Sequence, residues 1–114
     1  MNQSDFTQLV NQTNQATSGL LISKGAEYAG TADRLSNFKR ASTHTGVTPL
    51  QVAFVYASKH YDSIATFIRA DAAGFDHITT EPIDGRFHDL INYCHLMLAI
   101  LEEQRAAKLA SSES

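Results

Sequence analysis

The sequence holds few of the residues that define several common classes of small protein. It has one cysteine, Cys94, two prolines and no tryptophan among 114 residues. A lone cysteine excludes an intramolecular disulfide framework and is compatible with a reducing compartment. The apolar run at residues 96–101 is far shorter than the about 20 residues that span a bilayer. The amide-rich start does not resemble a signal peptide, so we expect a cytoplasmic protein without a membrane segment.

The sequence also lacks a large excess of either sign of charge. Lys and Arg number 9 against 12 Asp and Glu, which gives a formal net charge of −3, and no basic run occurs. That balance excludes the broadly basic surface that nucleic-acid-binding domains carry. A chain of this length fits one domain and buries enough surface to form a core without disulfides or metals.

Apolar residues recur at intervals of three and four along most of the chain, which is the period of an amphipathic α-helix. Residues 4–22 carry one such stripe, made of Phe6, Leu9, Val10, Thr13, Ala16, Thr17, Leu20 and Leu21. The pattern predicts a short helix at 33–42, a long helix at 49–72 that starts at Thr48-Pro49, and a last helix at 86–108. We therefore predict an all-α bundle of three long helices and one short helix. Its single domain, residues 1–114, comprises an N-terminal amphipathic helix (1–23), a core (24–109) and a frayed tail (110–114).

The last predicted helix is apolar around most of its circumference. Such a helix lies at the centre of a bundle or in an interface between subunits. We expect a homo-oligomer, a dimer or larger, that forms through this helix. Cys94 lies on the same helix and is expected to be a small buried residue.

Residues 24–31 contain two glycines and keep no helical period, which predicts a loop. A cation, an acid and a ring lie in this segment, and an amide, a ring and a second cation follow it. Side chains of these kinds suit one ligand when a loop brings them together. An equally weighted alternative is a loop that is packed by its tyrosine, with its charges in solvent. The candidate residues are Lys24, Glu27, Tyr28, Asn37, Phe38 and Lys39.

Acidic and basic side chains mix on the last two predicted helices. If these helices pack antiparallel, Lys59 and Asp62 can face Asp89 and Asn92. Gathered carboxylates suit Mg²⁺, and neighbouring cations suit phosphate groups. Spacing alone favours a second interpretation, in which the same residues form interhelical or surface ion pairs. The residues concerned are Lys59, Asp62, Asp84, Arg86, Asp89 and Asn92.

An ordered set of motifs runs through the chain from residue 24 to residue 103. The motifs are Lys24-Gly-Ala-Glu-Tyr28, Asn37-Phe-Lys-Arg40, Thr48-Pro49, Lys59-His-Tyr-Asp62, Glu81-Pro-Ile-Asp-Gly-Arg86 and Asp89-Leu-Ile-Asn-Tyr93. This set resembles the small phage and prophage proteins called nucleotide modification associated domain 1. That family is similar in turn to the all-α, MazG-like nucleoside triphosphate pyrophosphohydrolases. The resemblance implies a helical fold that commonly dimerises, a phosphate-bearing nucleotide as ligand, and Mg²⁺ where catalysis is intact.

The chain departs from the MazG-like pattern, in which one helix offers Glu-Glu-x-x-Glu and the next Glu-x-x-Asp. Here Asp62 lies near the first set, and Lys59 precedes it in place of an acid. Asp89 matches the acid of the second set, but Arg86 stands three residues before it. These cations weaken a cage for the metal that a hydrolase needs to activate water, and they favour direct binding of phosphate.

The resemblance and the charges together predict a phage-type nucleotide-binding protein, in the cytoplasm of an infected bacterial host. It would capture a free nucleotide or a nucleotide-derived signalling molecule, such as a host defence signal, without efficient hydrolysis and without a cofactor. One alternative is a Mg²⁺-dependent pyrophosphohydrolase that acts on canonical or modified dNTPs. Its catalytic residues would be Asp62, Asp84 and Asp89, with Asp62 and Asp89 on the metal. A second alternative is a protein-interaction module.

The predicted ligand-binding residues divide by chemistry. Rings would stack on a base, cations would hold phosphates, and acids and amides would contact the remaining polar groups. The full set is Lys24, Glu27, Tyr28, Asn37, Phe38, Lys39, Lys59, Asp62, Arg86, Asp89, Asn92 and Tyr93.

Overall fold

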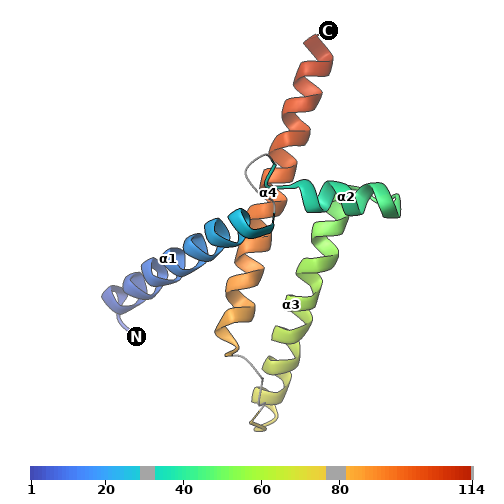
Figure 1. Cartoon of the computed structure of the whole chain (residues 1–114). Helices are drawn as coiled ribbons and strands as arrows, with labels where there is room; N and C mark the ends of the chain where they lie inside the picture. The colour runs from blue at the N-terminus through green and yellow to red at the C-terminus, as the bar shows by residue number, and fades with distance from the viewer. Residues whose placement is uncertain (29–32, 77–81, 114) are drawn as a thin grey trace.

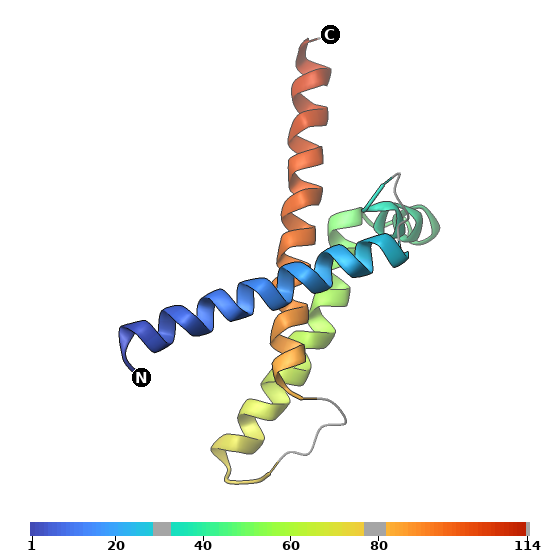
Figure 2. The same cartoon turned by 60° about the vertical axis from the view of Figure 1, so that its left-hand side comes forward.

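The computed structural model describes residues 1–28, 33–76 and 82–113, with the backbone alone at 25–28, and within these ranges every regular element is an α-helix. The helices are α1 (Gln3–Tyr28), α2 (Ser36–Thr45), α3 (Pro49–Ala72) and α4 (Asp84–Glu113). α3 and α4 run antiparallel and side by side, α2 lies across the first turns of α3, and α1 crosses α4 (Figures 1 and 2). The predicted all-α fold of three long helices and one shorter helix is confirmed.

α3 begins and ends where the sequence predicts. The Thr48 hydroxyl accepts a hydrogen bond from the Gln51 N–H at 3.1 Å, and the Gln51 side-chain oxygen accepts one from the Thr48 N–H at 2.9 Å. This reciprocal pair is a capping box, which satisfies two backbone donors that the first turn leaves free. Pro49 follows at the first helical position, where its missing N–H has no consequence.

Replacing Thr48 by alanine is expected to lower the free energy of unfolding by about 1 kcal/mol, because the capping hydrogen bond is lost. For a domain of this size that corresponds to a fall in Tm of about 4 °C. Thermal unfolding followed by circular dichroism measures the change. Thr48→Ser is the matched control, since it keeps the hydroxyl; an equal loss in both variants would contradict the capping explanation.

Three local expectations are wrong. The segment 24–28, predicted to open a loop, continues α1 to Tyr28, because the cost of about 1 kcal/mol for a glycine inside a helix is small enough for context to offset. α4 continues to Glu113 through the tail that was expected to fray. Cys94 is exposed, since α4 buries the stripe that carries Leu96 and Ile100 and turns Cys94 away from it.

The core lies where α2, α3 and α4 meet. Ala53 has 0% of its surface exposed, and its small side chain lets α3 approach the neighbouring helices closely. Leu96 and Ile100 of α4 belong to this core, with Leu35, Phe38 and Val52 from the other side. The most apolar helix therefore buries its central stripe within its own chain. Among the described residues, no helix is both long and apolar enough to cross a membrane.

Candidate functional site

A hollow of about 260 Å³ opens where α1 crosses the other helices. All four helices and the segment before α2 line it, and it is partly open to solvent. Its volume lies just below the range of about 300–1,000 Å³ that is typical of ligand pockets. The space therefore suits part of a small ligand whose remainder reaches the solvent. The lining residues are Leu20, Leu21, Lys24, Arg34, Asn37, Phe38, Tyr56, Asp89, Asn92, Tyr93 and Leu96.

One wall of the hollow is aromatic. The rings of Phe38 and Tyr56 lie 6.2 Å apart between centroids, and those of Tyr56 and Tyr93 lie 6.5 Å apart. The His60 ring lies 5.3 Å from that of Tyr93, at an angle of 30°. Aromatic pairs at these separations attract one another in tilted and edge-to-face arrangements. The wall offers a planar ligand several ring faces and edges.

Cationic side chains also line the hollow. Lys24 reaches it from the last turns of α1, and Arg34 from the segment before α2. Over the part of the chain that the structure describes, neither residue forms an ion pair. Both can therefore bind an anionic group without first giving up a carboxylate.

Asn92 brings an unsatisfied acceptor to the same place. The residue is 7% exposed and lines the hollow, and its side-chain oxygen has no hydrogen-bond partner among the residues described. A buried polar atom without a partner costs roughly 1–3 kcal/mol. A ligand that donates an N–H or O–H group to Asn92 would remove that penalty, so the hollow favours a ligand with a donor at this depth.

His60 and Asp89 meet beside the aromatic wall. The Nδ1 atom of His60 lies 3.5 Å from a carboxylate oxygen of Asp89 without forming a hydrogen bond to it. Burial lowers the pKa of His60 below its ordinary value, because loss of water disfavours the charged ring. Asp89 acts in the opposite direction, whereas Arg86, Lys24 and Lys59 add to the lowering. His60 is therefore neutral at pH 7.

This lowered pKa predicts a loss of stability in mild acid. As the pH falls below about 6.5, an unfolded histidine takes up a proton that His60 resists in the folded chain, so protons favour unfolding. We expect the free energy of unfolding to fall between pH 7.5 and pH 5.5, and to fall less in His60→Gln. Urea unfolding at the two pH values measures the fall in each chain. Subtracting one fall from the other removes the contribution of the remaining histidines, which both chains share. Equal pH dependence in the two chains would contradict the assignment.

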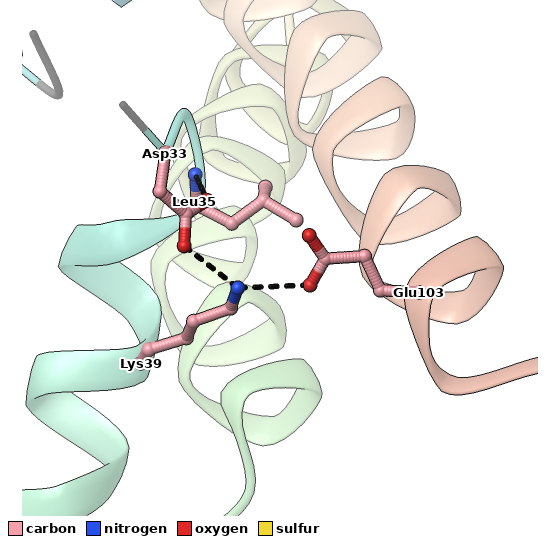
Figure 3. Close-up of polar contacts among 4 residues, drawn as sticks. All are labelled: Asp33, Leu35, Lys39 and Glu103. Carbon is pink, nitrogen blue, oxygen red and sulfur yellow. Dashed lines mark hydrogen bonds and ion pairs between the residues drawn. The ribbon is translucent and has the colours of Figure 1, made fainter. Parts of the chain in front are cut away.

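Lys39 lies in a separate ion cluster that connects the start of α2 to α4 (Figure 3). Its ammonium is 2.7 Å from Asp33 and 2.9 Å from Glu103. A carboxylate oxygen of Asp33 also accepts the N–H of Leu35 at 2.9 Å. Hydrogen bonds from Lys39 and Leu35 lower the pKa of Asp33, and those to Asp33 and Glu103 raise the pKa of Lys39. The cluster is solvent-exposed, so salt screens its ion pairs. Its two carboxylates bind Lys39, which the sequence had predicted to bind phosphate.

The structure brings six of the predicted ligand-binding residues to the hollow. Two others, Glu27 and Tyr28, have side chains outside the described residues, and four more do not line the hollow: Lys39, Lys59, Asp62 and Arg86. The six that do are Lys24, Asn37, Phe38, Asp89, Asn92 and Tyr93.

The sequence predicted that Lys59 and Asp62 of α3 would face Asp89, but the neighbouring residue His60 does so instead. α3 buries a stripe with Ala57 and Ile64, and His60 lies on this stripe. A helix turns about 100° per residue, so Lys59 and Asp62 share the face of α3 that points away from the stripe, and both are exposed. His60 is thus the α3 side chain that meets Asp89.

The acids considered for catalysis are dispersed. Asp89 lines the hollow, whereas Asp62 and Asp84 are exposed and do not line it. Among the side chains that the structure describes (residues 1–24, 33–76 and 82–113), no group of three His, Cys, Asp or Glu is placed to hold a metal ion.

Sequence reasoning missed Arg34, Tyr56 and His60. Tyr56 and His60 are four residues apart, and side chains at that spacing share one face of a helix. This pair was the signal that could have revealed the aromatic wall. Arg34 precedes α2 and carries no periodic signal, since only the crossing of α1 brings it to the hollow.

The chain matches no protein-family model, no curated protein and no solved structure. The resemblance to the phage family stays a prediction.

Proposed function

We propose that the chain binds a free nucleotide, or a small molecule derived from one, in the hollow between its four helices and holds it without efficient hydrolysis. The observation that carries this proposal is the combination of side chains on one hollow. Two cations that form no ion pair with any described residue, aromatic rings, and a buried acceptor that finds no partner among those residues line the same space. A nucleotide is a small molecule that presents the complement of all three, namely phosphates, a planar base and N–H donors.

The phosphates would lie against Lys24 and Arg34, the two cationic residues that line the hollow. An arginine guanidinium can hold a phosphate through two parallel hydrogen bonds, and a lysine adds a compact positive charge. Asn37 also lines the hollow, and its side-chain oxygen already accepts a hydrogen bond from Arg40 at 2.7 Å. Its amide N–H₂ would therefore serve the ligand as a further donor.

The base would enter the hollow against the aromatic wall. Phe38, Tyr56 and Tyr93 offer ring surfaces there, and stacking of a base on an aromatic side chain contributes about 1–3 kcal/mol. An N–H group of the base would donate to Asn92, and the neighbouring Asp89 would accept a second donor from the base or the sugar.

The placement of the acids supports capture over hydrolysis. Among Asp62, Asp84 and Asp89, Asp89 lines the hollow and the others do not. The nearest titratable neighbour of Asp89 is His60, at 3.5 Å, and it is not a second carboxylate that could share a metal ion. A pyrophosphohydrolase needs carboxylates that converge on Mg²⁺ and on the attacking water.

A thermal-shift panel tests binding directly. The protein is heated with each of the common ribo- and deoxyribonucleoside triphosphates and with cyclic dinucleotides. At 100 times its dissociation constant a ligand stabilises the folded state by about 2.7 kcal/mol, and we expect at least one compound to give a clear rise in Tm. If no compound shifts the Tm, the proposal is wrong, and a protein-interaction module becomes the better account.

The same panel with Mg²⁺ tests hydrolysis. We expect no pyrophosphate release above background from any compound that binds. Release that disappears in Asp89→Asn would establish the alternative, a Mg²⁺-dependent pyrophosphohydrolase. Release that Asp89→Asn leaves unchanged would point to a contaminating enzyme.

A further inference from the structure

The first turns of α1, residues 3–12, project from the rest of the molecule (Figures 1 and 2); we call this segment the arm. Phe6, Leu9 and Val10 are exposed along one stripe of it. No Lys, Arg, Asp or Glu occurs from residue 6 to residue 23, and depletion of charge is typical of the centre of a protein interface. The arm is also rich in Thr, Asn and Gln. In proteins most of the stability of a helix comes from packing of its apolar face, and the apolar stripe of the arm is exposed in the single chain.

α3 presents an exposed stripe of its own, which we call the seam. Its large residues Phe54, Tyr61 and Ile68 are each more than half exposed, and Ser58 and Ala65 lie between them. The steps from residue to residue are four, three, four and three, which is the spacing of a helix that packs along another helix. At 1.5 Å per residue the seam is about 21 Å long and the arm about 15 Å, so one arm fits within one seam.

The molecule is also too extended for a monomer of its size. Its radius of gyration is 17.4 Å, against about 13 Å for a compact chain of this length. Its accessible surface is 8333 Å², about 2,200 Å² more than a folded monomer of 12.5 kDa exposes. If two chains each buried that excess, the interface would be about 4,300 Å², within the range of obligate dimers.

We propose that a second copy of this chain covers both surfaces, with the arm of each subunit packed in the seam of the other. A two-fold dimer requires one chain to carry both halves of the contact, and this chain carries an apolar arm and an apolar seam of compatible lengths. A membrane surface fits the arm poorly, because helices that lie on membranes carry Lys and Arg on their polar face and the arm has neither. This proposal does not depend on the identity of the ligand.

Light scattering coupled to size exclusion measures the assembly. We expect the full-length chain to be a dimer of twice 12.5 kDa. The arm variant Phe6→Glu/Leu9→Glu and the seam variant Tyr61→Glu/Ile68→Glu should each raise the dissociation constant by about 100-fold or more, because each places two charges in the contact. The matched control Gln8→Glu/Gln12→Glu adds the same charge to the opposite face of the arm and should stay dimeric. Circular dichroism confirms that each variant keeps its helices.

Mixing the arm variant with the seam variant tests the reciprocal pairing. A mixed dimer retains one contact of the two, since the intact arm of one chain meets the intact seam of the other. Native mass spectrometry should therefore show more mixed dimer than either variant dimer. A monomeric parent chain, variants that stay dimeric, or a mixture without the mixed dimer would each overturn the proposal.

Discussion

The double variant Lys24→Ala/Arg34→Ala is expected to bind a nucleoside triphosphate at least 100-fold more weakly than the parent chain. Each side chain lines the hollow, and a hydrogen bond to a charged group contributes about 1.5–3 kcal/mol. Loss of both therefore removes about 3 kcal/mol or more, which is a factor of at least about 100 in the dissociation constant. Isothermal titration with the triphosphate that gives the largest thermal shift measures the change.

The matched control for that variant is Lys59→Ala/Arg69→Ala. It removes the same charge from α3, where both residues are exposed and neither lines the hollow. We expect its affinity to stay within threefold of the parent. If the control loses as much affinity as the double variant, binding follows the net charge of the surface and the hollow is not the site.

The Ile100→Ala variant is expected to lose more stability than Thr48→Ala, the other variant for which a loss of stability is predicted above. Ile100 is 4% exposed and belongs to the core between α2, α3 and α4, and truncation of a buried isoleucine costs about 2–5 kcal/mol through lost burial and the cavity left behind. Urea unfolding should show a lower midpoint with an unchanged slope. For a chain of marginal stability, this loss is a large fraction of the total.

Leu98→Ala is the control on the same helix. Leu98 is 58% exposed, so its truncation should change the free energy of unfolding by less than about 0.5 kcal/mol. A loss equal to that of Ile100→Ala would mean that the outer face of α4 is covered in solution. The interface would then lie on α4, as the sequence alone had suggested, and the arm and seam would lose their role.

The helices that could be predicted from sequence are those with local signals at their ends. α3 is the clearest case, because Thr48, Pro49 and Gln51 determine its start through contacts within one turn. The ends of α1 and α4 depend on distant parts of the chain. Nothing near Gly25 shows that the helix continues, because the outcome depends on how α1 packs across α4.

The site shows the same division between local and distant information. Asp89, Asn92 and Tyr93 occupy one short stretch of α4, so a sequence motif can group them. Tyr56 joins Tyr93 through the packing of α3 on α4, and Arg34 lines the same hollow as Lys24 where α1 crosses the other helices (Figure 2). How the helices pack and cross is not written in any one stretch of sequence.

Lys39 illustrates why charge patterns near a motif mislead. In sequence it follows Asn37 and Phe38, both of which line the hollow. In the fold its ammonium binds Glu103 of α4 and Asp33, so it lies in a different cluster. The partner that redirects it is far away in the sequence, and only the folded arrangement reveals it.

The central claim is that one hollow recognises a base and phosphates together. Isothermal titration of the parent chain with a nucleoside triphosphate, with the matching nucleoside and with inorganic triphosphate, all in one buffer, tests this most directly. We predict that the nucleotide binds at least tenfold more tightly than either fragment, because each fragment uses only part of the site. Equal affinity for inorganic triphosphate, or no binding of any of the three, would contradict the claim.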